Sequence, residues 1–519
     1  MTAFDGLMAF AVAALASLIG VPLVARLAAR LGAIDAPDGR RKSQVQAVPL
    51  GGGLAVALAA MAGVLVVISV SAPRGLLPAA GYWNPALPSA IVLIAVGLLD
   101  DTIGLTGIYK LIGQVLAATL LCSAGFRFES LSLFGMTMPL GEFGMPFSIF
   151  FCLGAINAFN LIDGADGLAS SIGAVVCVTL GMIAAAQGSV IASLASFAAS
   201  GALVGFLRYN APPARVYLGD TGSMLIGWLV AAVAIRCSIK QQAAVALAVP
   251  VAICAIPILD AAAALVRRIT TGQSVFTADR GHLHHALLLR GWTVGQTAAL
   301  AAGLTAVTCA GAIASFFTGQ EAFALIAVVG VVCTLAIARI FGHAEAALVR
   351  SHVRALGGRV LRRFRYRLPG AAAPAPTDQA VQLQGRRQWS NLWAALCEAA
   401  SVQKLSSVKL NISIPHLHES FFASWKASEP GPTEFAWRMS VPLHYGERPI
   451  GRLLIAGANG RTTLADMQQV LDYLEPLESE VARVVEEVEA DVVGGAGTGR
   501  FGATRALAGE PVAAIAQHY

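Results

Sequence analysis

The chain has 519 residues, of which 56% are hydrophobic and only 13% are charged, and its mean hydropathy is +0.69. A soluble globular domain carries about 25% charged residues, so most of this chain is expected to lie in a membrane. The formal net charge of +6 is modest, and we expect no nucleic-acid partner.

The cysteines and the N-terminal residues support two further predictions about this membrane protein. Seven of the eight cysteines lie in or next to apolar stretches, and the chain has no CxxC pair. They are interpreted as small buried hydrophobic residues rather than disulfides or metal ligands. The N-terminus lacks a basic segment and a small-residue cleavage site, so the first apolar run is predicted to be a retained membrane span.

Uncharged apolar runs predict eleven membrane spans, to within about one. The stretch 167–207 is long enough for two spans that fold back near Gln187 and Gly188. The runs lie near residues 6–25, 50–73, 86–99, 111–126, 145–162, 167–207, 221–235, 241–259, 293–316 and 322–338. The predicted transmembrane domain covers residues 1–342.

Positive charges divide the predicted connections into two groups. The connection after the first span and the one after the ninth are rich in Arg and Lys, whereas connections of the opposite parity hold isolated charges. The positive-inside rule therefore places the N-terminus outside and, with eleven spans, the C-terminus in the cytoplasm. We expect a multi-pass protein of the inner (plasma) membrane. The basic residues concerned are Arg26, Arg30, Arg40, Arg41, Lys42, Arg267, Arg268, Arg280 and Arg290.

The sequence changes character after the last span. Residues 343–367 hold seven arginines among apolar residues and predict a helix on the anionic membrane surface, with a solvated basic face as the alternative. Residues 368–386 are rich in Ala, Pro and Gln and predict a linker. The final residues, 491–519, are rich in Gly and Ala and are predicted to be disordered.

A small soluble domain is predicted at residues 387–490. Apolar alternation over 408–413, 435–441 and 450–455 indicates strands, and the pattern over 464–488 indicates an amphipathic helix. The order of these elements resembles a GAF-type sensor fold. The fold class expected for the whole chain is an all-α polytopic membrane protein with a small C-terminal cytoplasmic α/β domain.

Ionisable and amide side chains gather where predicted spans end. Such residues are costly in a membrane and usually functional. By the parity of the spans, all of these groups fall on the cytoplasmic side, whereas incidental polar residues would be distributed over both faces. The residues are Asp100, Asp101, Asn157, Asn160, Asp163, Asp166, Asp220, Asp260 and the segment 279–285.

The segment 157–168 reads NAFNLIDGADGL, with a polar residue at every third position. A helix presents Asn157, Asn160, Asp163 and Asp166 as one drifting stripe. These amides and carboxylates could hydrogen-bond a base and a ribose, or hold a cation. The alternative is a polar helix end stabilised by hydrogen bonds between helices.

Asp100 and Asp101 are adjacent and point about 100° apart on a helix, so they cannot share one geometric role. One could bind a metal while the other orients or deprotonates an acceptor; the alternative is a pair of carboxylates that marks a water boundary. Together with Asp220, and without a Cys/His ligand set, these carboxylates suit Mg²⁺ bound with phosphate oxygens, with Mn²⁺ as a second option.

Three histidines follow in DRGHLHH, together with Arg280. Zinc would need closed tetrahedral ligation, and no cysteine stands nearby in the sequence. A cationic phosphate clamp formed by His282, His284, His285 and Arg280 is therefore favoured over a metal site.

The motifs GLLDDTIGL with Lys110 and Gln114 following, NAFNLIDGADGL, GDTGS and HLHH resemble those of the polyprenyl-phosphate N-acetylhexosamine-1-phosphate transferases. The resemblance covers roughly residues 1–342. HLHH is more similar to the GlcNAc-type branch, typified by undecaprenyl-phosphate GlcNAc-1-phosphate transferase, than to the MurNAc-pentapeptide branch. Gln44 stands where many relatives have a histidine, and the C-terminal domain is not part of the family pattern.

The resemblance implies a reaction and a set of roles. UDP-N-acetylhexosamine and polyprenyl phosphate would give polyprenyl-diphosphate-N-acetylhexosamine and UMP, starting a cell-envelope polysaccharide. Asp100 and Asp101 would serve Mg²⁺ and the lipid phosphate, Asp220 would bind Mg²⁺, and Lys110 would contact substrate. The stripe from Asn157 to Asp166 would face the nucleotide, and the loop histidines would contact diphosphate. A homodimer is left open.

Two other classes share single features with the chain. A secondary transporter also carries intramembrane carboxylates, but they lie near the midplane in broken helices. A CDP-alcohol phosphatidyltransferase has an acidic signature similar to DGADGLA, but its arginine is replaced here by Ser170, and the further spaced aspartates are missing.

Overall fold

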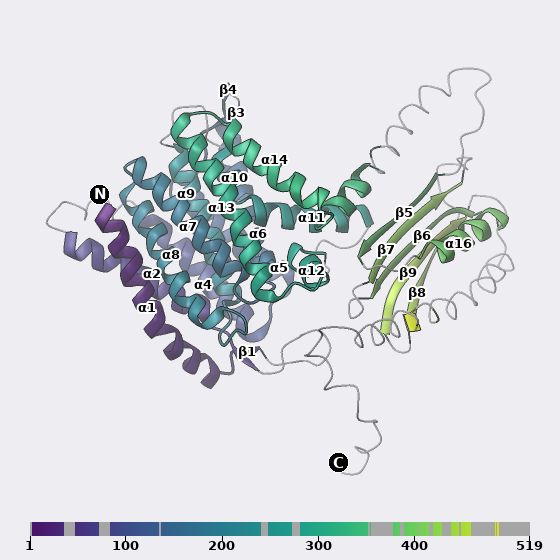
Figure 1. Cartoon of the computed structure of the whole chain (residues 1–519), viewed down its shortest axis with the longest axis horizontal. Helices are drawn as coiled ribbons and strands as arrows, with labels where there is room; N and C mark the ends of the chain where they lie inside the picture. The colour runs from purple at the N-terminus through teal and green to yellow at the C-terminus, as the bar shows by residue number, and fades with distance from the viewer. Residues whose placement is uncertain are drawn as a thin grey trace, which may run out of the picture. The chain divides into compact units, whose positions relative to one another are not determined.

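The computed structural model divides into two compact units, Met1–Ala346 and Ala347–Tyr519. Figure 1 shows the first unit as a bundle of helices and the second as a sheet with a helix beside it. The described residues are 3–35, 47–71, 84–133, 136–239, 248–271, 281–350, 353, 377–384, 389–403, 405–414, 419–427, 437–445, 448–457, 483, 485 and 486.

Seven described helices of the first unit are long and apolar enough to cross a membrane. They are α1 (Ala3–Arg30), α2 (Gly52–Ser71), α6 (Gly144–Ile162), α7 (Leu168–Ala186), α8 (Val190–Asn210), α9 (Gly219–Ile239) and α13 (Val294–Thr318). Shorter helices accompany them: α4 (Leu87–Ile103), α5 (Gly107–Ser123), α10 (Ala248–Ile253), α11 (Ala255–Thr271), α12 (Leu283–Leu288) and α14 (Ala322–Ile337).

Most of the predicted apolar runs coincide with these helices. The reversal expected near Gln187 and Gly188 is confirmed: α7 ends at Ala186, and Gly188 adopts the left-handed conformation with φ +65° before α8 begins. The run 241–259 differs from expectation. Within its described part, α10 stops at Ile253 and α11 continues to Thr271. Pro257 explains the break, because its ring clashes with the carbonyl four residues earlier, at Ile253.

Burial separates central helices from peripheral ones. In α7, α8 and α9, 72%, 72% and 78% of the apolar window is buried, compared with 22% in α1. The central helices are therefore the scaffold, whereas α1 leaves most of its apolar surface exposed, as a lipid-facing helix does. Cys122, Cys152, Cys177, Cys237, Cys254 and Cys309 are buried, as predicted, whereas Cys333 is exposed.

Small residues bring α9 close to its neighbours. A Cβ at Gly97 of α4 would lie 2.4 Å from Cα of Thr221, and a Cβ at Gly53 of α2 would lie 2.1 Å from the backbone nitrogen of Gly222. Helices in membranes pack closely through such small residues. The N-terminus of α9 is thereby fixed against both α4 and α2.

Short strands complete the first unit. Strands β1 (Ile34–Asp35) and β2 (Val48–Pro49) pair antiparallel, as do β3 (Ser130–Leu133) and β4 (Met136–Pro139). Leu50 forms a parallel bridge with Tyr217. The segment between α1 and α2 therefore lies beside the segment that leads into α9.

The second unit contains a five-stranded antiparallel sheet in the order β5-β7-β6-β9-β8. The strands are β5 (Thr377–Gln384), β6 (Leu405–Ile414), β7 (Glu419–Lys426), β8 (Trp437–Tyr445) and β9 (Arg448–Gly457), and α16 (Ser390–Val402) packs on β6. A core of buried apolar residues, among them Trp389, Trp393, Leu410 and Leu453, joins the helix to the sheet.

The strands predicted near 408–413, 435–441 and 450–455 correspond to β6, β8 and β9. The linker predicted at 368–386 is wrong over residues 377–384, which form β5 against β7. Residues 343–350 are helical, and most of the predicted surface helix beyond them lies outside the described residues. So do most of the predicted helix 464–488 and the tail 491–519.

Candidate active site

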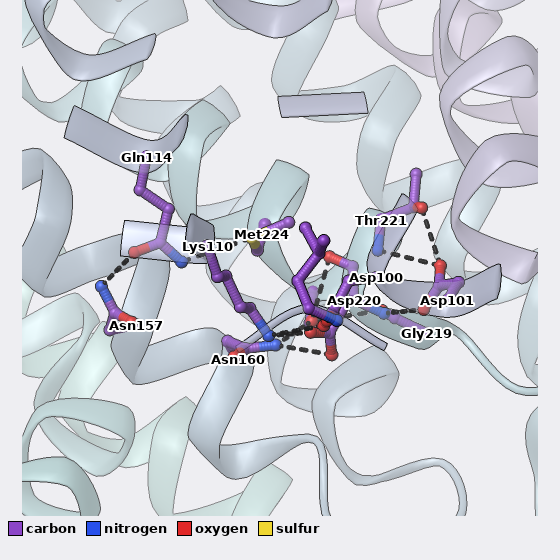
Figure 2. A network of polar contacts seen from close by, with 12 residues as sticks. Asp100, Asp101, Lys110, Gln114, Asn157, Asn160, Gly219, Asp220, Thr221 and Met224 are labelled. Atoms are coloured by element: carbon purple, nitrogen blue, oxygen red, sulfur yellow. Dashed lines mark hydrogen bonds and ion pairs between the residues drawn. The ribbon is translucent and has the colours of Figure 1, made fainter. Parts of the chain in front are cut away.

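Four helix ends meet at one end of the bundle and carry predicted site residues. Helices α4 and α6 end there, whereas α5 and α9 begin there. Because the helices alternate in direction, Asp100, Asn160 and Asp220 lie close together (Figure 2). Asn160 donates a hydrogen bond to Asp220, and Lys110 contacts both Asp100 and Asp220. The structure thus joins motifs that lie 60 residues or more apart in the sequence.

The ammonium group of Lys110 lies between two carboxylates. Its Nζ is 3.1 Å from Oδ2 of Asp100 and also forms an ion pair with Oδ2 of Asp220. The other oxygen of Asp100 accepts the backbone N–H of Leu105 at 2.6 Å, which fixes the turn between α4 and α5. The side chains of Lys110, Asp100 and Asp220 are 17%, 15% and 28% exposed, so the group remains accessible from outside the protein.

Asp101 turns away from this group and meets the first turn of α9. Its Oδ1 accepts the backbone N–H of Asp220 at 2.7 Å, and its Oδ2 accepts the hydroxyl of Thr221 at 2.7 Å and the Thr221 N–H at 3.2 Å. Helix N-termini leave such amides unpaired, and a carboxylate there is also stabilised by the helix dipole. Asp101 therefore acts as an N-cap supplied by another helix.

The close approach of Asp101 depends on Gly219. A Cβ at Gly219 would lie 2.8 Å from both carboxylate oxygens of Asp101, and φ of Gly219 is +71°. Both oxygens of Asp101 accept hydrogen bonds from the start of α9, so Asp101 caps this helix, and its expected role as a metal ligand stays a prediction. The adjacent aspartates thus face different partners, as their angular separation on the helix predicts.

Asn160 orients Asp220 from α6. Its Nδ2 donates to Oδ1 of Asp220 at 2.9 Å and lies 3.0 Å from Oγ of Ser223. The Asp220 carboxylate is therefore held by an amide on one oxygen and by Lys110 on the other. Ser223 received no role from the sequence, although it lies one helical turn after Asp220.

Asn157 has a different environment. Its Nδ2 donates to Oε1 of Gln114 at 2.8 Å and to the carbonyl of Leu153 at 2.9 Å, and Nε2 of Gln114 lies 3.3 Å from Sδ of Met224 (Figure 2). This chain of contacts links α6, α5 and α9. It matches the alternative reading of the stripe, a polar helix end with hydrogen bonds between helices.

Asp163 and Asp166 lie in the turn between α6 and α7. Oδ2 of Asp166 accepts the backbone N–H of Ala214 at 2.9 Å and ties this turn to the segment before α9. Asp163 makes no hydrogen bond within the described residues. Burial, followed by the nearby charges of Asp101 and Asp166, raises the pKa of Asp163 to about 7. Among the described residues, Asp163 is thus the carboxyl of this turn that carries no hydrogen bond.

The histidines lie on and before α12, and Arg280 lies outside the described residues. The rings of His282 and His284 stack with centroids 5.8 Å apart, and those of His284 and His285 lie 4.1 Å apart. His284 is 2% exposed, and neither of its ring nitrogens has a hydrogen-bond partner within the described residues. Burial lowers its pKa to about 4. Burial therefore favours the neutral form of His284 at pH 7, and the cationic phosphate clamp expected from the sequence stays a prediction.

Gly164 gives His284 its place beside the acidic turn. A Cβ at Gly164 would lie 2.6 Å from Cε1 and Nε2 of His284. The ring therefore packs directly on the backbone between Asp163 and Asp166. This contact brings the histidine segment and the NAFNLIDGADGL segment into one site.

Within the described residues, no group of three or more His, Cys, Asp or Glu side chains is arranged to hold a metal ion. Two oxygens, Oδ2 of Asp100 and Oδ2 of Asp220, nevertheless converge on one cationic group, the Lys110 ammonium. Mg²⁺ is commonly held by one or two carboxylates together with substrate phosphates rather than by a full protein cage. The residues present therefore fit Mg²⁺ bound jointly with a phosphate ligand.

The fold and the site define a multi-pass membrane protein with a charged polar site at one end of its helices. The family model described as "Glycosyl transferase family 4" matches residues 84–238, the part that contains Asp100, Lys110, the Asn157–Asp166 stripe and Asp220. The chain belongs to this family. The resemblance drawn from the motifs is thereby confirmed.

Several bacterial relatives align over about half of the chain. The "Probable undecaprenyl-phosphate N-acetylglucosaminyl 1-phosphate transferase" of Bacillus subtilis is 32% identical, covering 55% of this chain and 77% of the relative. The "Decaprenyl-phosphate N-acetylglucosaminephosphotransferase" of Mycobacterium leprae is 33% identical over 53% and 75%. The "Undecaprenyl-phosphate alpha-N-acetylglucosaminyl 1-phosphate transferase" of Escherichia coli K12 is 29% identical over 52% and 73%.

Proposed function

We propose that this protein transfers N-acetylglucosamine-1-phosphate from UDP-GlcNAc to undecaprenyl or a similar polyprenyl phosphate, releasing UMP and starting a cell-envelope polysaccharide. The observation that carries the proposal is the Lys110 ammonium held between Asp100 and Asp220 at the shared helix ends. The names of the relatives support the acceptor and the transferred group. No observation favours a phosphatidyltransferase or a transporter.

The reaction brings two anionic phosphates together, so charge must be neutralised and the attack aligned. Mg²⁺, when bound, would supply this neutralisation, and Asp220 and Asp100 are the residues that would hold it. Asn160 orients the Asp220 carboxylate through its own side-chain amide. Asp101 fixes the backbone of Asp220 by accepting its N–H. Lys110 neutralises the two carboxylates and offers its ammonium to a phosphate oxygen.

The proposed step is a single displacement. An oxygen of the polyprenyl phosphate forms a new bond to the sugar-bearing phosphorus of the donor. The bond from this phosphorus to the bridging oxygen breaks, and UMP leaves with that oxygen. Asp100 orients the acceptor. His282, His284 and His285 contact the diphosphate, with neutral His284 as a hydrogen-bonding rather than a charged group, and the Asp163–Asp166 turn faces the nucleotide.

We propose eleven spans, with the N-terminus outside, the site and the C-terminal unit in the cytoplasm, and the protein in the plasma membrane. The gathering of α4, α5, α6 and α9 ends at one end of the bundle supports this arrangement, because a single face then carries the chemistry. A site at a helix end also suits an acceptor whose phosphate lies at the interface while its tail stays in lipid.

Release of UMP tests the activity. Membranes containing the full chain are given undecaprenyl phosphate and UDP-GlcNAc, with Mg²⁺ or with a chelator, and UDP-GalNAc and UDP-glucose serve as donor controls. We expect Mg²⁺-dependent UMP formation and its loss in Asp220→Ala. Absence of UMP from every donor in the presence of Mg²⁺ would contradict the transferase.

The single displacement has its own test. The protein is incubated with UDP-GlcNAc labelled in the sugar-bearing phosphate, without acceptor lipid, and analysed after denaturation. We expect no label on the protein. A phosphorylated or GlcNAc-phosphorylated aspartate at Asp100 or Asp163 would replace the single step by a covalent intermediate.

A further inference from the structure

Asp260 is a buried carboxylate to which neither the motifs nor the proposed chemistry gives a task. It lies in α11 and is 1% exposed. An ionised carboxylate in such a position is costly unless its oxygens accept hydrogen bonds. Both oxygens of Asp260 do so, and both partners belong to the histidine segment at the start of α12.

The first partner is a backbone group. Oδ1 of Asp260 accepts the N–H of Leu283 at 2.7 Å. Leu283 is the first residue of α12, and His282, at the N-cap, makes no side-chain cap of its own. Asp260 therefore supplies from α11 the cap that the short helix lacks, and it fixes where α12 begins.

The second partner is an imidazole ring. Oδ2 of Asp260 lies 2.8 Å from Nδ1 of His282. A carboxylate only accepts hydrogen bonds, so Nδ1 must carry the proton. Nε2 of His282 is then the nitrogen left to face a ligand, and it makes no hydrogen bond within the described residues.

The orientation of His282 extends to the acidic turn. Its ring stacks on that of His284 with an interplanar angle of 9°, and the His284 ring packs on Gly164. A rotation of His282 would therefore disturb the ring that contacts the Asp163–Asp166 turn. The order of contacts runs from Asp260 through His282 and His284 to Gly164.

We propose that Asp260 is a positioning residue, which holds His282 in the Nδ1–H tautomer and anchors α12 so that the histidine segment stays docked on the acidic turn. The tautomer of His282 and the anchoring of α12 are inferred from geometry alone. Their effect on turnover rests on the proposed transferase function. Asp260 acts through His282 and need not touch substrate.

The test uses the full-length protein and two substitutions that separate the two hydrogen bonds. In Asp260→Asn, the amide oxygen can still accept the Leu283 N–H, but the amide NH₂ donates to Nδ1 and moves the ring proton to Nε2. In Asp260→Ala, both bonds are lost. The control is Asp5→Asn, because Asp5 is a buried aspartate of α1 that accepts the hydroxyl of Ser71, which an amide oxygen can also do.

The first readout is spectroscopic. ¹⁵N-histidine spectra, with His282 assigned by His282→Gln, are expected to show Nδ1 protonated in the parent protein and Nε2 protonated in Asp260→Asn. An Nε2-protonated His282 in the parent protein, or an unchanged tautomer in Asp260→Asn, would overturn the proposal. This readout remains valid if the protein releases no UMP, so a failure of the proposed function is distinguishable from a failure of the positioning role.

The second readout is a double-mutant cycle on UMP release. Asp260→Asn is expected to lower kcat/KM by about 10- to 100-fold, the order found when the carboxylate that orients a metal-ligating histidine is removed. In a His282→Gln background, Asp260→Asn should lower kcat/KM by less than about threefold, because the histidine that Asp260 positions is already absent. Equal losses in both backgrounds, with parent-like thermal stability, would contradict the proposal.

Discussion

The carboxylate of Asp101 accepts the backbone N–H of Asp220 at 2.7 Å, although 119 positions separate the two residues. The contact makes the position of one aspartate depend on the other. Asp220 is the residue proposed to hold Mg²⁺, and the start of its helix is fixed by a side chain from α4. Asp101 thus contacts the backbone at the start of α9, whereas Asp100 contacts the Lys110 ammonium that also pairs with Asp220.

The capping role of Asp101 predicts that its substitution lowers stability without a large change in the Mg²⁺ requirement. Asp101→Ala removes acceptors from two amides and one hydroxyl, and we expect it to lower stability by about 2 kcal/mol, as loss of a strong N-cap does. Asp101→Asn should retain part of that stability because one acceptor oxygen remains. Thermal unfolding of the detergent-solubilised protein measures both variants, with Asp5→Asn as the matched control.

The Mg²⁺ titration of the same variants identifies the ligand. Asp101→Asn is expected to leave the Mg²⁺ concentration for half-maximal UMP release within about threefold of the parent value, whereas Asp220→Asn should raise it by about tenfold or more. A larger increase in Asp101→Asn than in Asp220→Asn would make Asp101 the ligand instead.

Lys110 provides a second prediction because its ammonium occupies the space that two carboxylates share. Lys110→Met leaves Asp100 and Asp220 unpaired and close together, so we expect lower turnover, by about 10²-fold, and a lower Mg²⁺ requirement. The requirement falls because the variant no longer has an ammonium that competes for the same oxygens. Lys110→Arg keeps the charge and serves as the comparison. A raised Mg²⁺ requirement in Lys110→Met would show that the lysine assists the metal.

The location of the site can be predicted from the sequence, but the contacts of its individual residues cannot. Charged residues at span ends are costly, so Asp100, Asp101 and Asp220 are conspicuous in the sequence, and alternating helices bring them to one end. Which oxygen faces which partner depends on packing. Asp101 reaches α9 because Gly97 lets α4 approach Thr221 and because Gly219 leaves room for the carboxylate. Neither close approach can be read from spacing along the chain.

Other differences have equally local causes. Asn157 falls on the predicted stripe but meets Gln114, because α5 packs against that part of α6. Strand β5 is not predictable from the pattern, because TDQAVQLQ carries polar residues at both alternating sets of positions. The turn at Gln187–Gly188 is predictable because a glycine follows a polar residue in an otherwise uncharged stretch.

The contact between Gly164 and His284 gives a prediction with an internal control. Gly164→Ala would place a Cβ 2.6 Å from the His284 ring, so the ring must move from the acidic turn. We expect UMP release to fall by about tenfold or more while the helices stay folded. Gly154→Ala is the control, since a Cβ there meets nothing within 4 Å. Parent-like activity in Gly164→Ala would show that the position of His284 is unimportant.

Burial of His284 predicts how stability depends on pH. Its pKa is lowered from 6.5 to about 4 by burial, so the unfolded chain binds a proton below about pH 6.5 that the folded protein does not. Stability is therefore expected to fall as pH decreases from about 6.5 to 4, by up to roughly 3 kcal/mol from this residue. His284→Gln does not titrate and should make this part of the profile less steep. His343→Gln, at an exposed position, controls for the loss of a histidine as such. Thermal unfolding from pH 7.5 to 4.5 measures all three proteins, and identical slopes for the parent protein and His284→Gln would contradict the prediction.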